Sequence, residues 1–389
     1  MGLLVALHRI GPYHHARFQY AAHEQKLHVL ETRPQSQEYP WAFTPGSDYT
    51  IHRLSGHPNP EADPPIGDLD RQLVAVLAKA RPRVVVSVGW ADPAYQRLLL
   101  ICHRQRIPLV IVSDSRERVE PRCAVKEWMK QQLLRGYSAA VVAGTESRAY
   151  LEQLGLSPEA ITQPWDVVDN QLFSSAAAAA AAESSKSDPE EFLCVSRFIA
   201  VKNHLGLLRA YGLYQQAGGR WNLRLVGSGP EEAAIRAGVS ELPKPERVSL
   251  EPFRQLNALT DVYGKASAFV LASISDTWGL VVNEAMAAGL PVLVSSACGC
   301  TVDLIDHGST GFCFDPLDPR TLAQLMHRIE AQSAQERLTM VVAARRRLES
   351  FSLASFSQAL QDAAAYASAN PAFSWRSRCI AQLLSHRLQ

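Results

Sequence analysis

The strongest constraint on the fold is an alternation of short apolar runs with amphipathic stretches, which occurs twice along the chain. In the first half the apolar runs comprise residues 3–7, 84–88, 109–113 and 139–143. In the second half they comprise residues 192–195, 222–226, 248–250, 269–272 and 292–295. Continuous apolar strands alternating with helices are typical of a doubly wound parallel sheet that is buried on both faces. The pattern therefore predicts an α/β protein with two Rossmann-like sheets.

Length and composition place the domain boundaries. A chain of 389 residues is long for one hydrophobic core and favours two domains. Low-complexity sequence with seven consecutive alanines at 176–182 marks the boundary between them, as a linker or a poorly anchored helix. We predict a first domain at residues 1–172, a linker at 173–190 and a second domain at 191–366. The remaining residues, 367–389, have helical periodicity and are expected either to lie on the surface or to cross back to the first domain.

Charge and cysteine usage exclude several classes of protein. The net charge of +1 gives no indication of a nucleic-acid partner. Seven scattered cysteines favour a reducing cytoplasm over a disulfide framework, and Cys298 and Cys300 lack a second pair at zinc-ligand spacing. The D-x-D triplet Asp68-Leu69-Asp70 begins an amphipathic helix, where helix capping explains it without a metal. No run of 18 apolar residues is present, so we expect no membrane span. The cysteine usage predicts a cytoplasmic protein, and the cysteine spacing and the D-x-D triplet give no reason to expect a metal.

One segment of the first half is basic. Residues 116–135 contain six Lys or Arg against three Glu, and Trp128 lies among them. A basic helix that carries an aromatic side chain can dock on an anionic bilayer. Runs of this kind are more often solvated helix faces. Both a peripheral membrane contact and a solvated face remain open.

A pair of acids marks the candidate site. Asp276 and Glu284 flank an apolar, glycine-containing turn between two strands of the second half. Ligands of parallel sheets bind at the carboxyl ends of strands and the amino ends of the following helices. Arg197 and Lys202 occupy another strand-to-helix loop and offer two cations there. In the first half, polar strand ends at 89–92 and 113–116 are also suited to a site.

Glycines at the same strand ends add backbone donors. Gly227-Ser228-Gly229 allows the backbone to approach a ligand closely, although such turns are abundant. The amides of Gly279 and Leu280 can point at an anion. Two cations, several amides and two acids together provide what a nucleoside diphosphate sugar requires: charge compensation for the diphosphate and acceptors for sugar hydroxyls.

The motifs of the second half resemble those of a known enzyme family. Ser-Arg-Phe-Ile-Ala-Val-Lys-Asn from Ser196, Gly-Ser-Gly-Pro-Glu from Gly227, Asp-Thr-Trp-Gly-Leu-Val-Val-Asn-Glu-Ala from Asp276 and Gly-Ser-Thr-Gly-Phe from Gly308 occur in the family's order. They resemble the retaining glycosyltransferases of family four (glycosyl transferases group 1). The resemblance covers residues 191 to about 350, and the first half adds only its architecture and the segment 166–173. It implies the GT-B fold, in which two Rossmann-like domains face a central cleft. The first domain, 1–172, would then bind the acceptor, and the second, 191–366, would bind the nucleotide sugar.

The resemblance also implies roles for individual residues. Arg197 and Lys202 would hold the diphosphate, Glu284 the nucleotide ribose and Asp276 the donor sugar. The residues implied to bind the nucleotide sugar also include Gly227, Gly229, Phe253, Trp278, Gly279 and Leu280. Transfer in this family is thought to occur on one face of the sugar, with the leaving phosphate taking the acceptor's proton. It then requires neither an enzyme nucleophile nor a metal.

Two departures from the family pattern concern the reacting groups. Asp276 replaces the family's first glutamate, and its shorter side chain withdraws the carboxylate by about 1.5 Å. Many members carry a histidine after a first-domain strand, where this chain has Asp114. Asp114, His14 or His15 would have to replace that imidazole. The glycine-rich first loop of the family is replaced by a loop that begins at Gly11, on the acceptor or phosphate side.

The sequence thus predicts a retaining, metal-independent glycosyltransferase. It would move a hexose from a nucleoside diphosphate sugar to a glycan, a glycolipid or a small acceptor. Alternatives are a sugar-nucleotide epimerase or hydrolase on the same fold, and a protein that binds a nucleotide sugar without catalysis. The donor base and sugar, the acceptor, the linkage and the oligomeric state are not encoded in these patterns.

Overall fold

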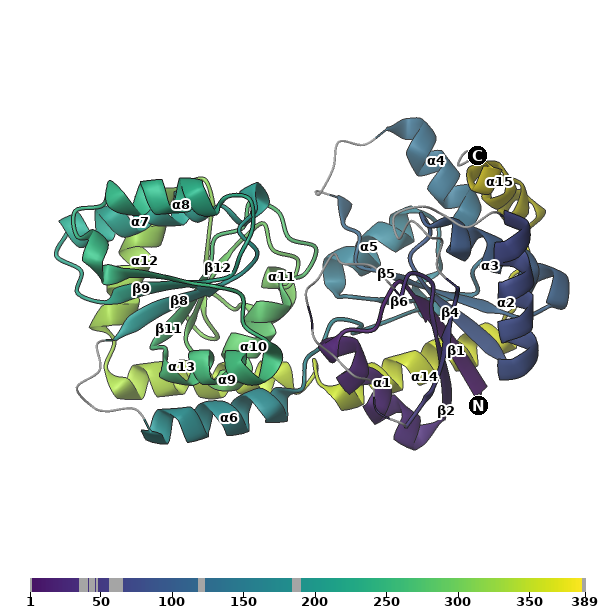
Figure 1. The fold of residues 1–389 in the computed structure, drawn as a ribbon, viewed down its shortest axis with the longest axis horizontal. Coiled ribbons are helices and arrows are strands. Elements are labelled where there is room, and N and C mark those ends of the chain that lie inside the picture. Colours follow the sequence, from purple (N-terminus) through teal and green to yellow (C-terminus); the bar gives the residue numbers. More distant parts are fainter. Residues whose placement is uncertain are drawn as a thin grey trace. The chain divides into compact units, whose positions relative to one another are not determined.

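The computed structural model describes residues 2–34, 41, 46, 48–55, 66–117, 123–183 and 190–386. The chain forms two compact units, and each contains one parallel sheet with helices packed against it (Figure 1). The first unit comprises Met1–Val167 together with Leu353–Gln389, and the second comprises Val168–Ser352. This architecture confirms the predicted α/β class with two Rossmann-like sheets.

The first unit is built on seven parallel strands. They are β1 (Gly2–Leu7), β2 (Lys26–Glu31), β3 (Thr50–Arg53), β4 (Val84–Val88), β5 (Leu109–Ser113), β6 (Ala139–Val142) and β7 (Ile161–Thr162). Their order in the sheet is β3-β2-β1-β4-β5-β6-β7, and all neighbours in the sheet are parallel. The order reverses between β1 and β4, so the carboxyl ends of these two strands form the topological switch point at which such sheets bind ligands.

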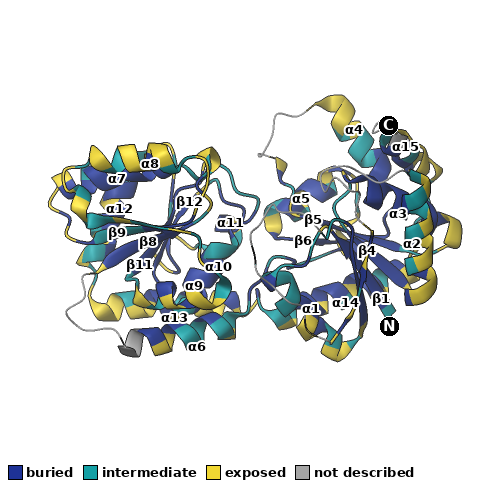
Figure 2. Ribbon diagram, in the orientation of Figure 1, coloured by how far each residue is buried: buried dark blue, intermediate teal, exposed yellow. Residues whose placement is uncertain are grey.

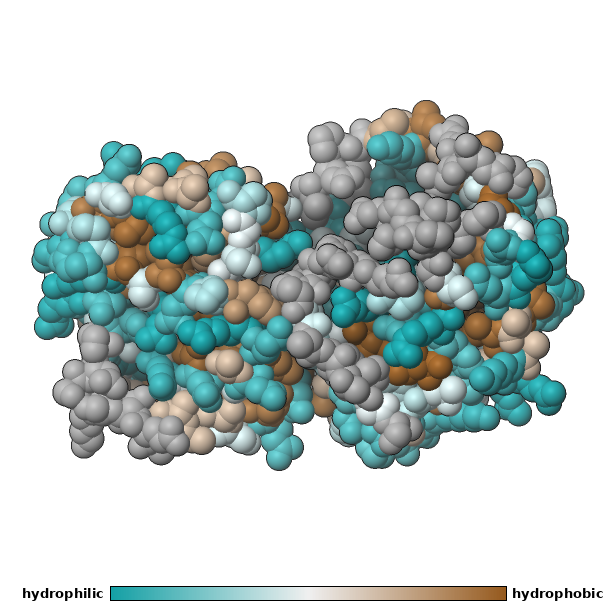
Figure 3. Space-filling model, viewed as in Figure 1, coloured by the Kyte–Doolittle hydropathy of each residue, from teal (hydrophilic) through white to brown (hydrophobic). Residues whose placement is uncertain are grey.

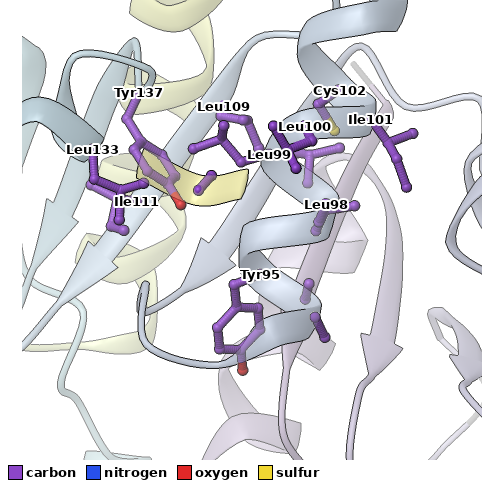
Figure 4. Packing of buried hydrophobic residues seen from close by; sticks show 14 of the residues in the cluster. Tyr95, Leu98, Leu99, Leu100, Ile101, Cys102, Leu109, Ile111, Leu133 and Tyr137 are labelled. Carbon is purple, nitrogen blue, oxygen red and sulfur yellow. The ribbon is translucent and has the colours of Figure 1, made fainter. Parts of the chain in front are cut away.

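Helices bury the faces of this sheet. They are α1 (Pro12–Glu24), α2 (Ile66–Ala80), α3 (Pro93–Gln105), α4 (Ala124–Leu134), α5 (Thr145–Gln153), α14 (Leu353–Ala369) and α15 (Trp375–His386). The core on one face joins side chains of α3 to Leu109, Ile111, Leu133 and Tyr137 (Figure 4). Helix α3 is buried over most of its length because it is covered in turn by α2 and α15 (Figure 2).

The second unit repeats the arrangement with six parallel strands. They are β8 (Glu191–Val195), β9 (Asn222–Val226), β10 (Val248–Glu251), β11 (Ala268–Leu271), β12 (Val292–Ser295) and β13 (Phe312–Phe314). Their order is β10-β9-β8-β11-β12-β13, and the neighbours are again parallel. Its switch point therefore lies between β8 and β11, as the first unit's lies between β1 and β4.

Eight helices of the second unit lie in the described part of the chain. They are α6 (Asn170–Glu183), α7 (His204–Gln216), α8 (Glu232–Ser240), α9 (Leu256–Lys265), α10 (Leu280–Ala288), α11 (Thr301–Leu304), α12 (Pro319–Ala331) and α13 (Ala334–Leu348). Their apolar faces pack with the strands into a second core centred on buried aromatic residues such as Phe192 and Tyr211.

Helix α6 contradicts the predicted linker at 173–190. The alanine run is helical because alanine has the highest helix propensity. Ala177 and Ala180 are buried, and a Cβ added to Gly264 of α9 would lie 2.6 Å from the Ala180 Cβ. Only small side chains allow α6 and α9 to approach so closely, so the run is a packed helix of the second unit. Residues 184–189 of the predicted linker lie outside the described residues.

The end of the chain belongs to the first unit. Thr162 Oγ1 donates to the Ala359 carbonyl of α14 over 2.8 Å, and Ser377 Oγ of α15 donates to the Leu133 carbonyl over 2.7 Å. The second unit therefore ends at Ser352, whereas the sequence had placed its boundary at residue 366. Local sequence patterns carry no signal for the sheet on which a helix such as α14 packs.

Candidate functional site

The predicted donor-site residues gather at the switch point of the second unit. Lys202 follows β8 in a short 3₁₀ turn, and Asp276 follows β11. The Lys202 ammonium forms a direct ion pair with Asp276 Oδ2, and both side chains are largely buried. Because an ammonium has three N–H donors, Lys202 can hold Asp276 and still bind an anion.

Backbone contacts between the strand-end loops fix this pair. The Ile274 N–H donates to the Val201 carbonyl over 2.9 Å, which joins the loops that carry Asp276 and Lys202. The loop after β12 joins them from the other side, because the Gly299 N–H donates to the Asp276 carbonyl over 3.1 Å. The two charged side chains therefore project from loops that are held by main-chain hydrogen bonds.

The glycines of the Gly227-Ser228-Gly229 turn serve this loop packing. A Cβ on Gly227 would lie 1.9 Å from the Ser196 carbonyl oxygen, and one on Gly229 would lie 2.4 Å from the Phe198 carbonyl oxygen. The Phe198 N–H also donates to the Ser228 carbonyl over 2.8 Å. These glycines thus allow the turn to approach the chain's own loop after β8. The sequence analysis had predicted that they allow the backbone to approach a ligand.

Glu284 lies in the second turn of α10 and is 0% exposed. It is therefore not a first-turn acid that compensates the helix dipole. The Tyr263 hydroxyl of α9 donates to Glu284 Oε2 over 2.6 Å, and the Phe173 ring of α6 packs edge-on against Tyr263 at 5.8 Å between centroids. Sequence reasoning missed Tyr263, because nothing in its local pattern distinguishes it from a core aromatic.

The other predicted donor residues are distributed unevenly. Gly279 is the N-cap of α10 with φ of 102°, a left-handed conformation that favours glycine, and Leu280 begins the helix. Arg197 is exposed after β8, and Phe253 is half-buried after β10. Trp278 is only 3% exposed, and its indole N–H donates to Asn283 Oδ1 over 3.0 Å. The Trp278 side chain therefore packs in the core of the second unit, and its contact with the donor stays a prediction.

A buried histidine lies beside the Lys202 loop. His204, the first residue of α7, forms a 2.9 Å hydrogen bond with Ser196 Oγ. Burial, reinforced by the charge of Lys202, lowers the pKa of His204 to about 4. This imidazole is therefore neutral near pH 7.

The first-unit residues that the sequence singled out do not converge. His14 Nδ1 accepts a 3.3 Å hydrogen bond from the Gly11 N–H, which occupies the amide assigned to phosphate. Burial and the nearby Arg17 charge lower the pKa of His14 to about 3. The His15 ring instead forms a 2.9 Å hydrogen bond with the Tyr49 hydroxyl. Asp114 is exposed after β5.

A different group occupies the switch point of the first unit. His8 follows β1 directly, and its Nε2 lies 3.1 Å from Asp92 Oδ2 after β4. Arg33 Nε donates to the same oxygen over 2.7 Å. Burial alone would raise the pKa of Asp92, but the hydrogen bonds from His8 and Arg33 outweigh it and lower that pKa. The sequence signal for His8 is its position at the end of the first strand.

Two negative findings concern the described residues alone. Within the described ranges, no three His, Cys, Asp or Glu side chains are arranged to hold a metal ion. No helix in the part of the chain that the structure covers is both long and apolar enough to cross a bilayer.

The sequence comparisons bear on the second unit. Residues 177–347 match the family model of glycosyl transferases group 1. A D-inositol 3-phosphate glycosyltransferase of Streptomyces bingchenggensis is 27% identical over 272 residues, which are 63% of this chain and 56% of that protein. The first three curated relatives that the chain matches are aligned over only 36% to 42% of their own length.

The structural comparisons cover both units. A glycosyltransferase from Rickettsia africae ESF-5 superposes with a TM-score of 0.72 at 14% identity, over 93% of this chain and 97% of that one. Anabaena HepE in complex with UDP-glucose superposes with a TM-score of 0.65 at 17% identity, over 93% and 98%. These likenesses identify the fold as GT-B.

Proposed function

We propose that the protein is a glycosyltransferase that uses a nucleoside diphosphate sugar as its donor. The observation that carries the proposal is the Lys202–Asp276 pair at the switch point between β8 and β11, with Glu284 on the next helix. The family match over residues 177–347 and the UDP-glucose complex of HepE support this assignment. The Lys202 ammonium and the exposed Arg197 offset the charge of the diphosphate, while Glu284 and Asp276 accept hydrogen bonds from ribose and sugar hydroxyls.

We further propose that transfer retains the anomeric configuration and needs no metal. The leaving phosphate then takes the proton of the acceptor hydroxyl while the new glycosidic bond forms on the same face of the hexose. The chain's contribution is electrostatic, because Lys202 and Arg197 stabilise negative charge as the bond to the diphosphate breaks. The acceptor is a glycan, a glycolipid or a small hydroxylated molecule.

The test begins with a thermal-shift screen over nucleotide sugars, including UDP-glucose, followed by a radiolabelled turnover assay with the best donor. Transfer predicts that sugar moves to an added acceptor with release of the nucleoside diphosphate. Complete turnover without an acceptor would indicate the epimerase or hydrolase alternative. Stabilisation without any product would indicate the non-catalytic binding protein. Transfer that survives EDTA and gives the donor's anomer supports the finer proposal, whereas an inverted product contradicts it.

We also propose a peripheral contact with anionic membranes, through a surface larger than the predicted segment 116–135. Residues 118–122 of that segment lie outside the described residues. Within it, Trp128 on α4 is 54% exposed. Trp375 at the start of the adjacent α15 is 63% exposed. Exposed tryptophan is typical of membrane interfaces.

Charge supports the same surface. Arg376 and Arg378 are exposed on α15, which carries no acid in its sequence, and Lys126 is exposed on α4. Apolar surface is visible over the outer end of α4 (Figure 3). Cosedimentation with phosphatidylcholine vesicles containing phosphatidylglycerol tests the contact. Arg376→Glu/Arg378→Glu should abolish it, and an equal loss in Arg346→Glu/Arg347→Glu on α13 would show a non-specific effect of net charge.

A further inference from the structure

The two units carry matching contacts at their switch points. In the second unit, a cation after β8 meets a carboxylate after β11. In the first unit, His8 after β1 meets Asp92 after β4. Both pairs lie at the carboxyl edge where the strand order reverses, which is where doubly wound sheets bind their ligands. The His8–Asp92 pair has no part in the donor chemistry described above.

Packing fixes the orientation of His8. Its ring stacks on Tyr95 with 5.4 Å between centroids and an interplanar angle of 4°. Its backbone is held as well, because the Arg33 N–H donates to the His8 carbonyl over 2.8 Å. Asp92 is itself fixed as the N-cap of α3, where Oδ1 accepts from the Ala94 N–H over 2.8 Å. A ring held on one face and at one nitrogen is pre-organised for a ligand.

The remaining edge of the imidazole is available to a ligand. The His8 side chain is 46% exposed, and Nδ1 forms no hydrogen bond with any other described residue. Asp92, kept ionised by its partners, accepts the proton on Nε2 and so leaves a lone pair on Nδ1.

We propose that His8, at the switch point of the first unit, orients the acceptor, because its Nδ1 accepts a hydrogen bond from an acceptor hydroxyl. The ligand is a sugar or another polyhydroxylated molecule. Asp92 is a positioning residue that sets the tautomer and orientation of the ring. This inference rests on the proposed transferase function. Since the leaving phosphate takes the proton in that reaction, His8 holds a hydroxyl and does not remove its proton.

The kinetic test separates acceptor binding from donor chemistry. His8→Ala should raise the acceptor KM about tenfold, as the loss of one hydrogen bond predicts, while the release of nucleotide to water stays unchanged. Asp92→Asn should raise the KM as well, because an amide donates to Nε2 and turns Nδ1 into a donor. Arg148→Gln is the matched control, since it breaks an ion pair of similar kind with Glu152 on α5, another element of the same unit.

A binding experiment covers the case in which the natural acceptor is unknown. The His8 imidazole resonance, assigned by its loss in His8→Ala, is followed while methyl α-glucoside, methyl α-mannoside and myo-inositol are titrated in turn. A saturable shift from any of these probes, lost in Asp92→Asn, supports the site. The proposal is overturned if none of the three probes shifts the resonance, or if the acceptor KM of His8→Ala is unchanged. It is also overturned if His8→Ala lowers kcat and adds a new limb to the pH–rate profile, because that would show a role in proton transfer. Failure to bind any nucleotide sugar would instead be a failure of the proposed function.

Discussion

The carboxyl edges of the two sheets differ in how their side chains come together. In the second unit, Asp276 and Glu284 lie eight positions apart on one loop and helix, and Lys202 belongs to a contiguous motif. In the first unit, His8, Arg33 and Asp92 come from three strand ends spread over 85 positions. A site whose residues lie in short motifs can be recognised in a sequence. A site whose residues come from distant strand ends can be recognised only when the order of the strands in the sheet is known.

The largest expected effect concerns the donor edge. Lys202→Ala and Glu284→Ala should each abolish transfer, a fall of more than about 10³-fold in kcat/KM, because each removes a charged group from the proposed donor site. Circular dichroism and thermal melting check that the fold is retained, and Glu284→Gln keeps a partner for the Tyr263 hydroxyl. Near-normal turnover in Lys202→Ala or Glu284→Ala would contradict the assignment of the donor to the carboxyl edge of the second sheet.

A smaller effect is expected when the acceptor edge is altered in the same assay. His8→Ala should leave the donor KM unchanged, because the ring belongs to the other unit, so the loss appears only at limiting acceptor. Measuring the donor KM and the acceptor KM of the wild-type protein and of His8→Ala under the same conditions makes the comparison. A raised donor KM in His8→Ala would show that the edges are not separable.

The stability of the second unit should depend on pH through the buried His204. The pKa of His204, about 4 when folded, lies below the 6.5 of an unperturbed histidine, so the unfolded chain binds the proton first as the pH falls. This residue's contribution to stability is present above pH 6.5 and declines below it, by about 2 to 3 kcal/mol at pH 4.5. Denaturant unfolding of His204→Gln should therefore depend less steeply on pH between 6.5 and 4.5. Identical slopes would exclude this residue as the cause.

The smallest effect is expected at Asp276, where the chain departs from the family pattern. Asp276→Glu adds a methylene and advances the carboxylate by about 1.5 Å into a pair already in contact. We expect a change of about tenfold in the preference for UDP-glucose over UDP-galactose, measured as a ratio of kcat/KM values. An unchanged ratio and rate would show that the length of this acid does not set donor choice.

The sequence predicted the class of fold because that class depends on local patterns, whereas the donor roles of its candidate residues stay predictions. Apolar periodicity identified the long strands, and Lys202, Asp276 and Glu284 lie on one unit as expected. The burial of Trp278 was not predicted, because a motif does not reveal which of its side chains turn into the core. His14 and His15 drew attention as a pair, yet the isolated His8 lies at the switch point. The alanine run was taken for a linker because low complexity does not reveal a packing partner.

The close crossing of α6 and α9 has a consequence for the join between the two units. Phe173 lies six positions after the last residue of the first unit's opening segment, Val167, and contacts the tyrosine that holds Glu284. The Phe173–Tyr263 contact thus connects the segment that joins the two units to Glu284, the acid assigned to the ribose. Phe173→Leu should weaken UDP binding more than Phe192→Leu, which removes an equally buried ring elsewhere in that core, and calorimetric titration would compare them. The segment that joins the units would then also tune nucleotide affinity.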